Sequence, residues 1–297
     1  MYSGVYKWLW FTSSRVEAAM TMDQQVLAEG TVTASSGRQQ KGLRESARSI
    51  LIPAIALILI TVTWEAYVRL ADVPLFIIPP ASDVLREMVT DFGGLWPSMW
   101  ATLHETLLGF GASIAVGVPL AIVLVSFRPL EEAIYPLLVA SQVVPKIAIA
   151  PVFVVWWGFG IFPKIMVVFL IAFFPIVIST AVGLRETEVE KIYLAQTMGA
   201  GRIQTLTRFR LPGALPSMFG GIKVAATLAV IGAVVAEFVA ADVGLGHAIV
   251  RANARIDTVA AFAAIGWLTI IGVVLYGSID VLERVLLPWH VSRRSAA

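Results

Sequence analysis

Cysteine is absent from this chain of 297 residues. A disulfide scaffold, a zinc or iron–sulfur site held by thiolates and a cysteine nucleophile are therefore all excluded. Histidine is also scarce, because His104, His247 and His290 lie far apart in the sequence and predict no metal site. The formal net charge of only +2 gives no reason to expect a nucleic-acid partner.

Charged residues make up only 14% of the chain, whereas about 25% is usual in soluble domains. Hydrophobic residues account for 58%. Too few polar side chains remain to cover the surface of a water-soluble globule. The composition therefore predicts a protein that lies in a lipid bilayer.

Six apolar stretches are long enough to cross the roughly 30 Å hydrocarbon core of a bilayer as helices. They cover residues 50–71, 99–125, 134–157, 162–184, 217–239 and 259–286. Pro136, Pro145 and Pro151 interrupt the third stretch, which predicts a kinked or broken helix. We expect that segment to be internal, because neighbouring protein must satisfy the backbone groups that a break leaves unpaired. The predicted fold class is an all-α integral membrane protein.

Residues outside the spans divide the rest of the chain. Residues 1–49 are polar, and we interpret them as a disordered cytoplasmic extension; the alternative is a start placed too far upstream, with Met20 or Met22 as the first residue. Residues 50–290 form the transmembrane domain, with a long connection at 185–216, and residues 291–297 form a short tail.

Lysine and arginine residues are concentrated in three segments beside the spans. The N-terminal flank carries Arg38, Lys41, Arg44 and Arg48. The 185–216 connection carries Arg185, Lys191, Arg202, Arg208 and Arg210, and the tail carries Arg293 and Arg294. Cytoplasmic segments of membrane proteins carry an excess of these residues. Both termini and the 185–216 connection are therefore predicted to lie in the cytoplasm.

The 185–216 connection is the only long cytoplasmic one, and such length indicates either function or disorder. Its apolar residues recur at helical spacing, Gly199 and Gly201 interrupt them, and Leu211-Pro212 is expected to end the element. This pattern predicts two short amphipathic helices around a glycine break. Such a structure offers an apolar ridge to a partner.

The same segment resembles the cytoplasmic signature of bacterial ABC importer permeases, E-A-A-x3-G-x9-I-x-L-P. Tyr193, Leu194 and Phe209 stand where that signature has glutamate, alanine and isoleucine. The resemblance implies that this segment sits in a cleft of an ATPase subunit and couples its closure to the spans. The residues that it assigns to this coupling are Tyr193, Leu194, Ala195, Gly199, Ala200, Leu211 and Pro212.

Further motifs between residues 51 and 289 narrow the resemblance to the permeases for nitrate, taurine, aliphatic sulfonates and thiamine precursors. They are Trp64-Glu65, Pro79-Pro80, Lys146 through Pro151, Trp157-Gly158-Phe159-Gly160, Phe173-Phe174-Pro175, Gly221 through Ala225, Glu237, Gly244-Leu245-Gly246 and Pro288-Trp289. Their order within a six-span layout makes the resemblance specific. It implies the six-helix fold of a type I ABC importer permease.

The resemblance also implies partners and a place in the cell. The chain would be a multi-pass permease of the bacterial inner membrane, paired as a homodimer and working with two ATPase subunits and a periplasmic solute-binding protein. No G-x-x-x-x-G-K-[ST] motif occurs in the chain, so we expect ATP to be bound by a partner subunit and this chain to be neither an enzyme nor the carrier of a cofactor. The sequence leaves open which small solute is carried and whether the paired permeases are identical.

Small residues indicate which helix faces touch within a membrane. Gly109, Ser113 and Gly117 recur every four residues in the second span and predict one such face. In the fifth span, small residues share a face with Glu237, which should therefore point into the bundle.

Two ionisable residues inside the spans are candidates for the solute pathway. Glu237 either lines the pathway or caps the turn at Gly244-Leu245-Gly246, and it could also pair with Lys146. Lys146 either attracts an anionic solute or has a structural role as a paired or snorkelling lysine. The sequence does not decide between these roles.

Two other classes of protein compete with the permease. A self-contained secondary transporter or channel should show internal repeats or several charges at the bilayer midplane, and neither is visible. A polytopic membrane enzyme should present acids, histidines or nucleophiles together at one membrane face. The long ordered connection is expected only of the permease.

Overall fold

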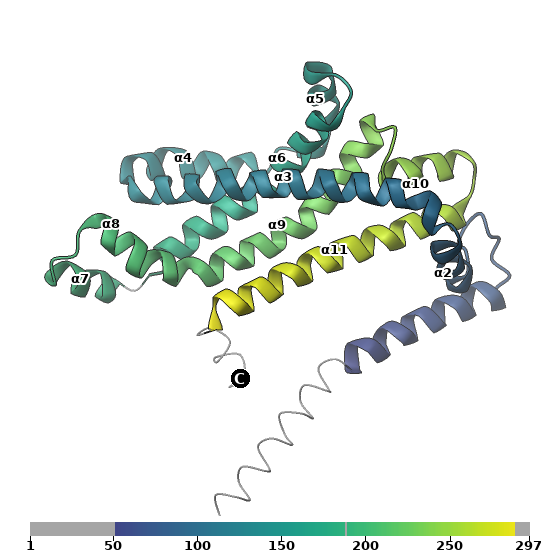
Figure 1. Ribbon diagram of the computed structural model, residues 1–297, viewed down its shortest axis with the longest axis horizontal. Coiled ribbons are helices and arrows are strands. Elements are labelled where there is room, and N and C mark those ends of the chain that lie inside the picture. The colour runs from purple at the N-terminus through teal and green to yellow at the C-terminus, as the bar shows by residue number, and fades with distance from the viewer. Residues whose placement is uncertain (1–50, 188, 289–297) are drawn as a thin grey trace, which may run out of the picture. The chain divides into compact units, whose positions relative to one another are not determined.

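The computed structural model describes residues 51–187 and 189–288 (Figure 1). The predicted extension at 1–49, the tail at 291–297 and the ends of the chain lie outside the described residues. The chain divides into two units after Tyr67. In the first unit the described residues are all helical, within the helix Leu51–Leu70.

The described residues of the second unit fold into helices joined by short turns. In chain order these are α2 (Ala81–Thr90), α3 (Phe92–Ser126), α4 (Arg128–Ser141), the 3₁₀ helix η1 (Lys146–Ile149), α5 (Ala150–Trp157), α6 (Ile161–Arg185), α7 (Val189–Thr197), α8 (Arg202–Thr205), the π helix η2 (Leu206–Arg210), α9 (Leu211–Ala240), α10 (Leu245–Ala254) and α11 (Thr258–Leu286).

The predicted spans are confirmed as helices. Five helices are long and apolar enough to cross a bilayer, and they are Leu51–Leu70, Phe92–Ser126, Ile161–Arg185, Arg202–Ala240 and Thr258–Leu286. The third predicted stretch corresponds to α4 and the η1–α5 pair, which pass the same test together but are bent by 86°, the geometry of a broken span or of a re-entrant loop. The break lies just before Pro145, where the sequence predicted an interruption.

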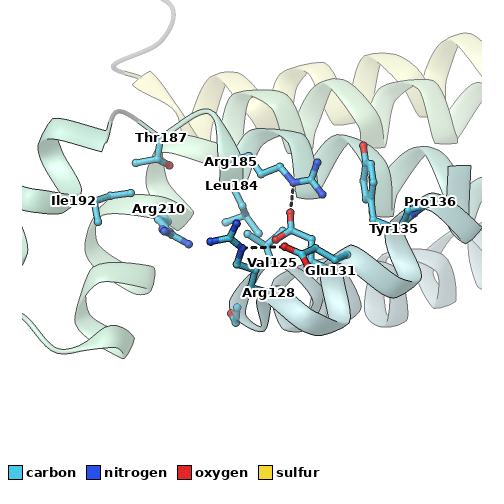
Figure 2. A pocket seen from close by; sticks show the side chains of 12 residues that line it. Val125, Arg128, Glu131, Tyr135, Pro136, Leu184, Arg185, Thr187, Ile192 and Arg210 are labelled. Atoms are coloured by element: carbon cyan, nitrogen blue, oxygen red, sulfur yellow. Dashed lines mark hydrogen bonds and ion pairs between the residues drawn. The ribbon is translucent and has the colours of Figure 1, made fainter.

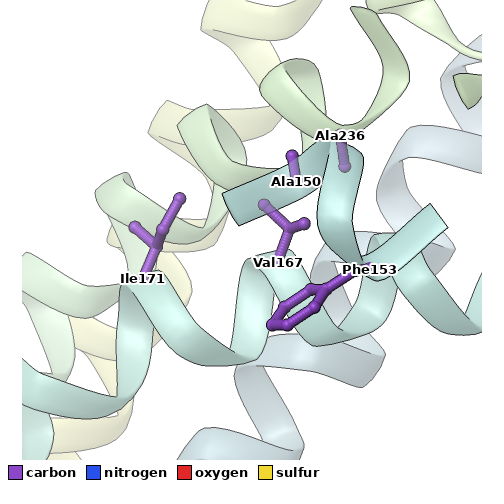
Figure 3. Close-up of a cluster of buried hydrophobic side chains, with 5 residues drawn as sticks. All are labelled: Ala150, Phe153, Val167, Ile171 and Ala236. Carbon is purple, nitrogen blue, oxygen red and sulfur yellow. The ribbon is translucent and has the colours of Figure 1, made fainter. Parts of the chain in front are cut away.

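The expectation that the whole third span is internal is wrong within this chain. α4 has no fully buried residue. In the second half, Ala150 and Phe153 of α5 are buried against Val167 and Ile171 of α6 and Ala236 of α9 (Figure 3). In the first half, one face of α4 is partly buried against a core cluster of α3 and α6, through Leu130, Ile134, Tyr135 and Leu138. The opposite face of α4 is exposed.

Helix α6 is the centre of the second unit, and it packs against both α3 and α9 (Figure 1). Glycine allows these close approaches. A Cβ added to Gly109 of α3 would lie 2.5 Å from Cβ of Val168 in α6, and one added to Gly221 of α9 would lie 2.3 Å from Cβ of Ser179. The Ser113 hydroxyl crosses the same α3–α6 contact and donates to the carbonyl of Phe169 at 3.1 Å. The predicted small-residue face of the second span is therefore confirmed.

Candidate functional site

The connection between α6 and α9 folds into α7, α8 and η2, with Gly199 at the break that the sequence predicted. Gly199 has φ of +81°, in the left-handed region that favours glycine. The amide of Ala200 donates to the carbonyl of Ala195 at 2.9 Å, which closes the end of α7. This is the usual way in which a glycine ends a helix and reverses the chain.

An apolar ridge is exposed along this connection. Ala195 is buried, and its neighbours point outward. The exposed side chains are Tyr193 (64%), Leu194 (61%), Met198 (79%) and Ile203 (78%). Large apolar side chains gathered on a short segment, at the end of a helix bundle, are typical of a surface that another protein covers. We call these four residues the apolar ridge.

Leu211 and Pro212 do not end the element, and that expectation is wrong. They are the first residues of α9, and the helix runs without a break from Arg202 to Ala240. Pro212 offers no N–H to the carbonyl four residues before it, and the wider π turn of η2 lies directly upstream. The proline therefore modifies the helix instead of stopping it.

Two cavities lie beside this connection. The larger, of about 670 Å³, is lined by Val125, Ser126, Arg128, Glu131, Glu132, Tyr135, Pro136, Leu184, Arg185, Thr187, Ile192 and Arg210 (Figure 2). The smaller, of about 410 Å³, is lined by Ser126, Phe127, Ile192, Gln196, Ala200, Arg202, Ile203, Thr205, Leu206 and Arg210. Both cavities therefore separate α7 and η2 from the corner where α3 ends and α4 begins.

Ion pairs in the larger cavity connect α4 to α6. Arg185 pairs with Glu131, and its guanidinium lies 4.0 Å from the centroid of the Tyr135 ring (Figure 2). Arg128 and Glu132 form a second pair within α4, at 3.0 Å between Nε and Oε1. The first pair joins the exposed helix α4 to the central helix of the unit.

Glu237 is almost completely buried at the end of α9, where it joins three helices. Its Oε1 accepts from the Thr102 hydroxyl at 2.6 Å, and its Oε2 accepts from the amide of Gly246 at 2.6 Å. The amide of Leu245 in turn donates to Thr102 Oγ1 at 2.9 Å. Glu237 and Thr102 thus accept hydrogen bonds from the first backbone amides of α10, which would otherwise lack hydrogen-bond partners.

Lys146 lies away from Glu237. Its Nζ stands 4.5 Å from the centroid of the Phe174 ring, a cation–π contact at the start of η1. The ion pair with Glu237 that the sequence left open is not among the ion pairs of the described residues.

Sequence reasoning missed two buried ion pairs between spans. Lys164 of α6 pairs with Glu105 of α3. Lys223 of α9 pairs with Asp280 and Glu283 of α11. Ionisable residues within spans usually pair with one another, so opposite charges at similar depth in neighbouring predicted spans were the signal that could have found them. Among the described residues, no group of three or more metal-ligating side chains comes together.

Comparison with known proteins gives consistent matches. Residues 113–288 match the family model of the binding-protein-dependent transport system inner membrane component. The formylaminopyrimidine transport permease protein ThiX of Halalkalibacterium halodurans is 37% identical over 240 residues, which cover 81% of this chain and 96% of that protein. The riboflavin transport system permease protein RibX of Chloroflexus aurantiacus is 40% identical over 240 residues, covering 80% and 90%.

Two further matches extend the comparison. The taurine transport system permease protein TauC of Escherichia coli is 31% identical over 240 residues, which cover 78% of this chain and 87% of that protein. A chain of the MetNI methionine ABC transporter, solved in inward-facing conformations, has a TM-score of 0.56 at 21% identity, with 64% of this chain and 95% of that chain covered. The last match shows the fold of a type I ABC importer permease.

Proposed function

The chain belongs to the family of binding-protein-dependent transport system inner membrane components, and from that premise we propose how it works. It is the membrane-spanning permease subunit of an ATP-driven importer for a small solute, and it is a multi-pass protein of the inner membrane. None of the relatives favours a self-contained transporter or channel.

The apolar ridge of α7 and α8 is the surface onto which an ATPase subunit docks. The observation that carries this proposal is the exposure of Tyr193, Leu194, Met198 and Ile203 around the left-handed turn at Gly199. Covering these side chains removes apolar surface from water, which stabilises the complex. The hydrogen bond from the amide of Ala200 to the carbonyl of Ala195 closes the turn that carries the ridge.

A displacement of the apolar ridge would be passed to two membrane-spanning helices of the core, α6 and α9. α7 follows α6 after a short turn, and η2 continues into α9 through Leu211 and Pro212 without a break. α6 and α9 in turn pack closely at Gly221. Closure of the ATPase subunits would therefore shift α6 and α9 together and change which side of the membrane the solute path faces.

The remaining partners follow from the family and from the sequence. ATP is bound and hydrolysed by the partner ATPase, because this chain has no phosphate-binding loop motif. A periplasmic binding protein delivers the solute, and a second identical permease completes the path. Both termini and the apolar ridge face the cytoplasm, as the arginine and lysine distribution predicts.

The solute is proposed to be a ring-bearing vitamin or vitamin precursor. The names of two relatives state formylaminopyrimidine and riboflavin, and their identities of 37% and 40% exceed the 31% of the taurine permease.

The two ionisable candidates are assigned structural roles. The hydrogen bonds of Glu237 to Thr102 and Gly246 support a cap on α10 in preference to a place in the pathway. The contact of Lys146 with the Phe174 ring supports a structural role over attraction of an anionic solute.

Co-purification from membranes with the tagged chain as bait tests the docking surface. Wild type is compared with Leu194→Asp, with a deletion of residues 193–202 and with the matched control Thr207→Asp, which adds the same charge at an exposed position outside the ridge. We expect an ATP-hydrolysing subunit to elute with wild type and with Thr207→Asp but not with the other two variants. The mass of the intact complex should correspond to two permease copies and two ATPase subunits.

Two results would contradict the proposal. If Leu194→Asp and the deletion retain the ATPase at the wild-type level, the ridge is not its docking surface. If no nucleotide-binding partner elutes and the purified chain alone moves solute in liposomes, the chain does not work as an importer subunit.

A further inference from the structure

The larger cavity beside α4 and η2 has an unbalanced set of charges. Among the described residues, five charged side chains line it, of which three are arginines and two are glutamates. Arg185 is paired with Glu131 and Arg128 with Glu132. Arg210 is the third arginine, and the glutamates that line the cavity are already engaged with the other two. The lining therefore carries one positive charge in excess.

Two polar groups on the α7 and η2 side of this cavity have no partner among the described residues. The Nε of Arg210 and the Oγ1 of Thr187 are both shielded from solvent and make no hydrogen bond within that part of the chain. Both residues line the larger cavity, and Figure 2 shows them on the side opposite the start of α4. Buried donors without partners are rare, because leaving one unsatisfied costs free energy.

From this arrangement we infer that the larger cavity binds a phosphate group. Phosphate presents several acceptor oxygens to donors that come from different directions, and a guanidinium is well suited to bind it. Arg210 and the Thr187 hydroxyl supply such donors from η2 and from the turn after α6. A phosphate diester carries a single negative charge, which balances the single excess positive charge of the lining.

The surroundings of the cavity favour a membrane phospholipid as the carrier of this phosphate. The cavity, of about 670 Å³, is far larger than one phosphate group and extends to Tyr135 and Pro136 of α4. Beyond these residues α4 exposes Leu137 and Val139, and none of its residues is fully buried. An acyl chain could lie along this apolar surface while the headgroup occupies the basic end. Basic pockets between spans are a known form of lipid headgroup site.

Binding of the full-length purified chain to soluble short-chain lipids tests the inference. The chain in a non-ionic detergent is titrated with dioctanoyl phosphatidylglycerol, with dioctanoyl glycerol, which lacks the phosphate, and with inorganic phosphate. The readouts are equilibrium binding and the shift in unfolding temperature. We expect phosphatidylglycerol to bind and to raise the unfolding temperature, and dioctanoyl glycerol to do neither. Binding of inorganic phosphate with similar affinity would support the site and identify a soluble phosphate compound as its ligand, whereas binding of the lipid alone would identify a headgroup.

Three variants connect the result to named residues. Arg210→Gln should weaken binding by roughly tenfold or more, since it removes a charge-assisted contact, and Thr187→Val should weaken it less. Arg208→Gln is the matched control, because Arg208 is exposed on the same turn and does not line the cavity. It should bind as wild type does. Elution as a single species checks that each variant is folded, and Thr187→Val tests the site without changing charge.

The inference is overturned by any of three results. The first is that neither phosphatidylglycerol nor inorganic phosphate binds. The second is that dioctanoyl glycerol binds as well as phosphatidylglycerol. The third is that Arg210→Gln and Thr187→Val both bind the phosphate-bearing compounds as tightly as wild type does. The measurement needs no ATPase partner and no transported solute, so its outcome is independent of whether the apolar ridge is the docking surface.

Discussion

Glu237 is a buried polar residue whose hydrogen-bond partners the structure defines. Glu237 accepts hydrogen bonds from Thr102 and from Gly246, and the Leu245 amide completes the group. The glycines of the adjoining turn leave room for the carboxylate, since a Cβ on Gly246 would lie 2.8 Å from Glu237 Oε2. A carboxylate is needed here because two donors approach its two oxygens from different helices.

Glu237→Gln tests this role. An amide has only one oxygen, so either the Thr102 hydroxyl or the Gly246 amide faces an NH₂ group and loses its acceptor. We expect the protein to lose about 1–3 kcal/mol of stability and to unfold at a lower temperature in detergent. Asp242→Asn, at an exposed position in the same turn, is the control and should change little. Unchanged stability of Glu237→Gln, together with lost transport, would assign the residue to the solute pathway instead.

The buried charges of the ion pairs between spans also have partners on neighbouring helices. Lys223 is buried on α9 between Asp280 and Glu283, which lie on one face of α11. A single buried ammonium with no counter-ion would be costly in the membrane. These contacts therefore specify which faces of α9 and α11 meet, in addition to the packing of small residues.

At the scale of helices, the described part of the connection between α6 and α9 consists of helices that meet at the turn around Gly199. α7 ends at the left-handed Gly199, and α8, η2 and α9 then form one continuous helix of 39 residues from Arg202 to Ala240. A long helix transmits displacement along its whole length. The turn at Gly199 sets the direction in which the apolar ridge projects. Under the proposed function we therefore expect coupling to depend on the backbone conformation of this turn.

Gly199→Leu and Gly201→Leu distinguish the effect of backbone conformation at the turn from the effect of adding a large side chain. An added Cβ meets nothing within 4 Å at either glycine, so both positions have open space where the side chain begins. Gly199 has φ of +81°, where a leucine costs about 1–2 kcal/mol, whereas Gly201 has an ordinary φ of −71°. In proteoliposomes of the complete importer we expect Gly199→Leu to hydrolyse ATP with little transport. Gly201→Leu should couple as wild type does, and equal coupling in both variants would contradict the role of the turn.

At the scale of the whole molecule, the chain is one part of an importer whose solute is selected with the help of a binding protein. The ring-bearing solute proposed above rests on the names of two relatives, which state formylaminopyrimidine and riboflavin.

Uptake by the reconstituted importer tests the solute class. The complex purified through this chain is placed in proteoliposomes with its binding protein outside and ATP inside. We expect ATP-dependent accumulation of labelled riboflavin or formylaminopyrimidine, and little accumulation of taurine. A matched preparation with a non-hydrolysable ATP analogue controls for leakage and adsorption. A preference for taurine or nitrate would reject the proposed class and leave the permease function intact.

The sequence by itself determined the all-α membrane fold, the positions of the spans and the family. Span length and apolar composition are properties of a continuous stretch, and the interruption before Pro145 and the glycine break at Gly199 are local backbone effects. The signature around Ala195 and Gly199 is equally local. Each of these features can be read from residues close together in the chain.

Only the tertiary structure decided which side chains meet. The partners of Glu237, the pairing of Lys164 with Glu105 and the excess charge around Arg210 join residues from helices far apart in the sequence. The sequence left Lys146 and Glu237 as possible partners because both are ionisable residues in apolar spans. Helix rotation and depth determine such contacts, and they follow from the packing of several helices at once, which no single stretch of sequence specifies.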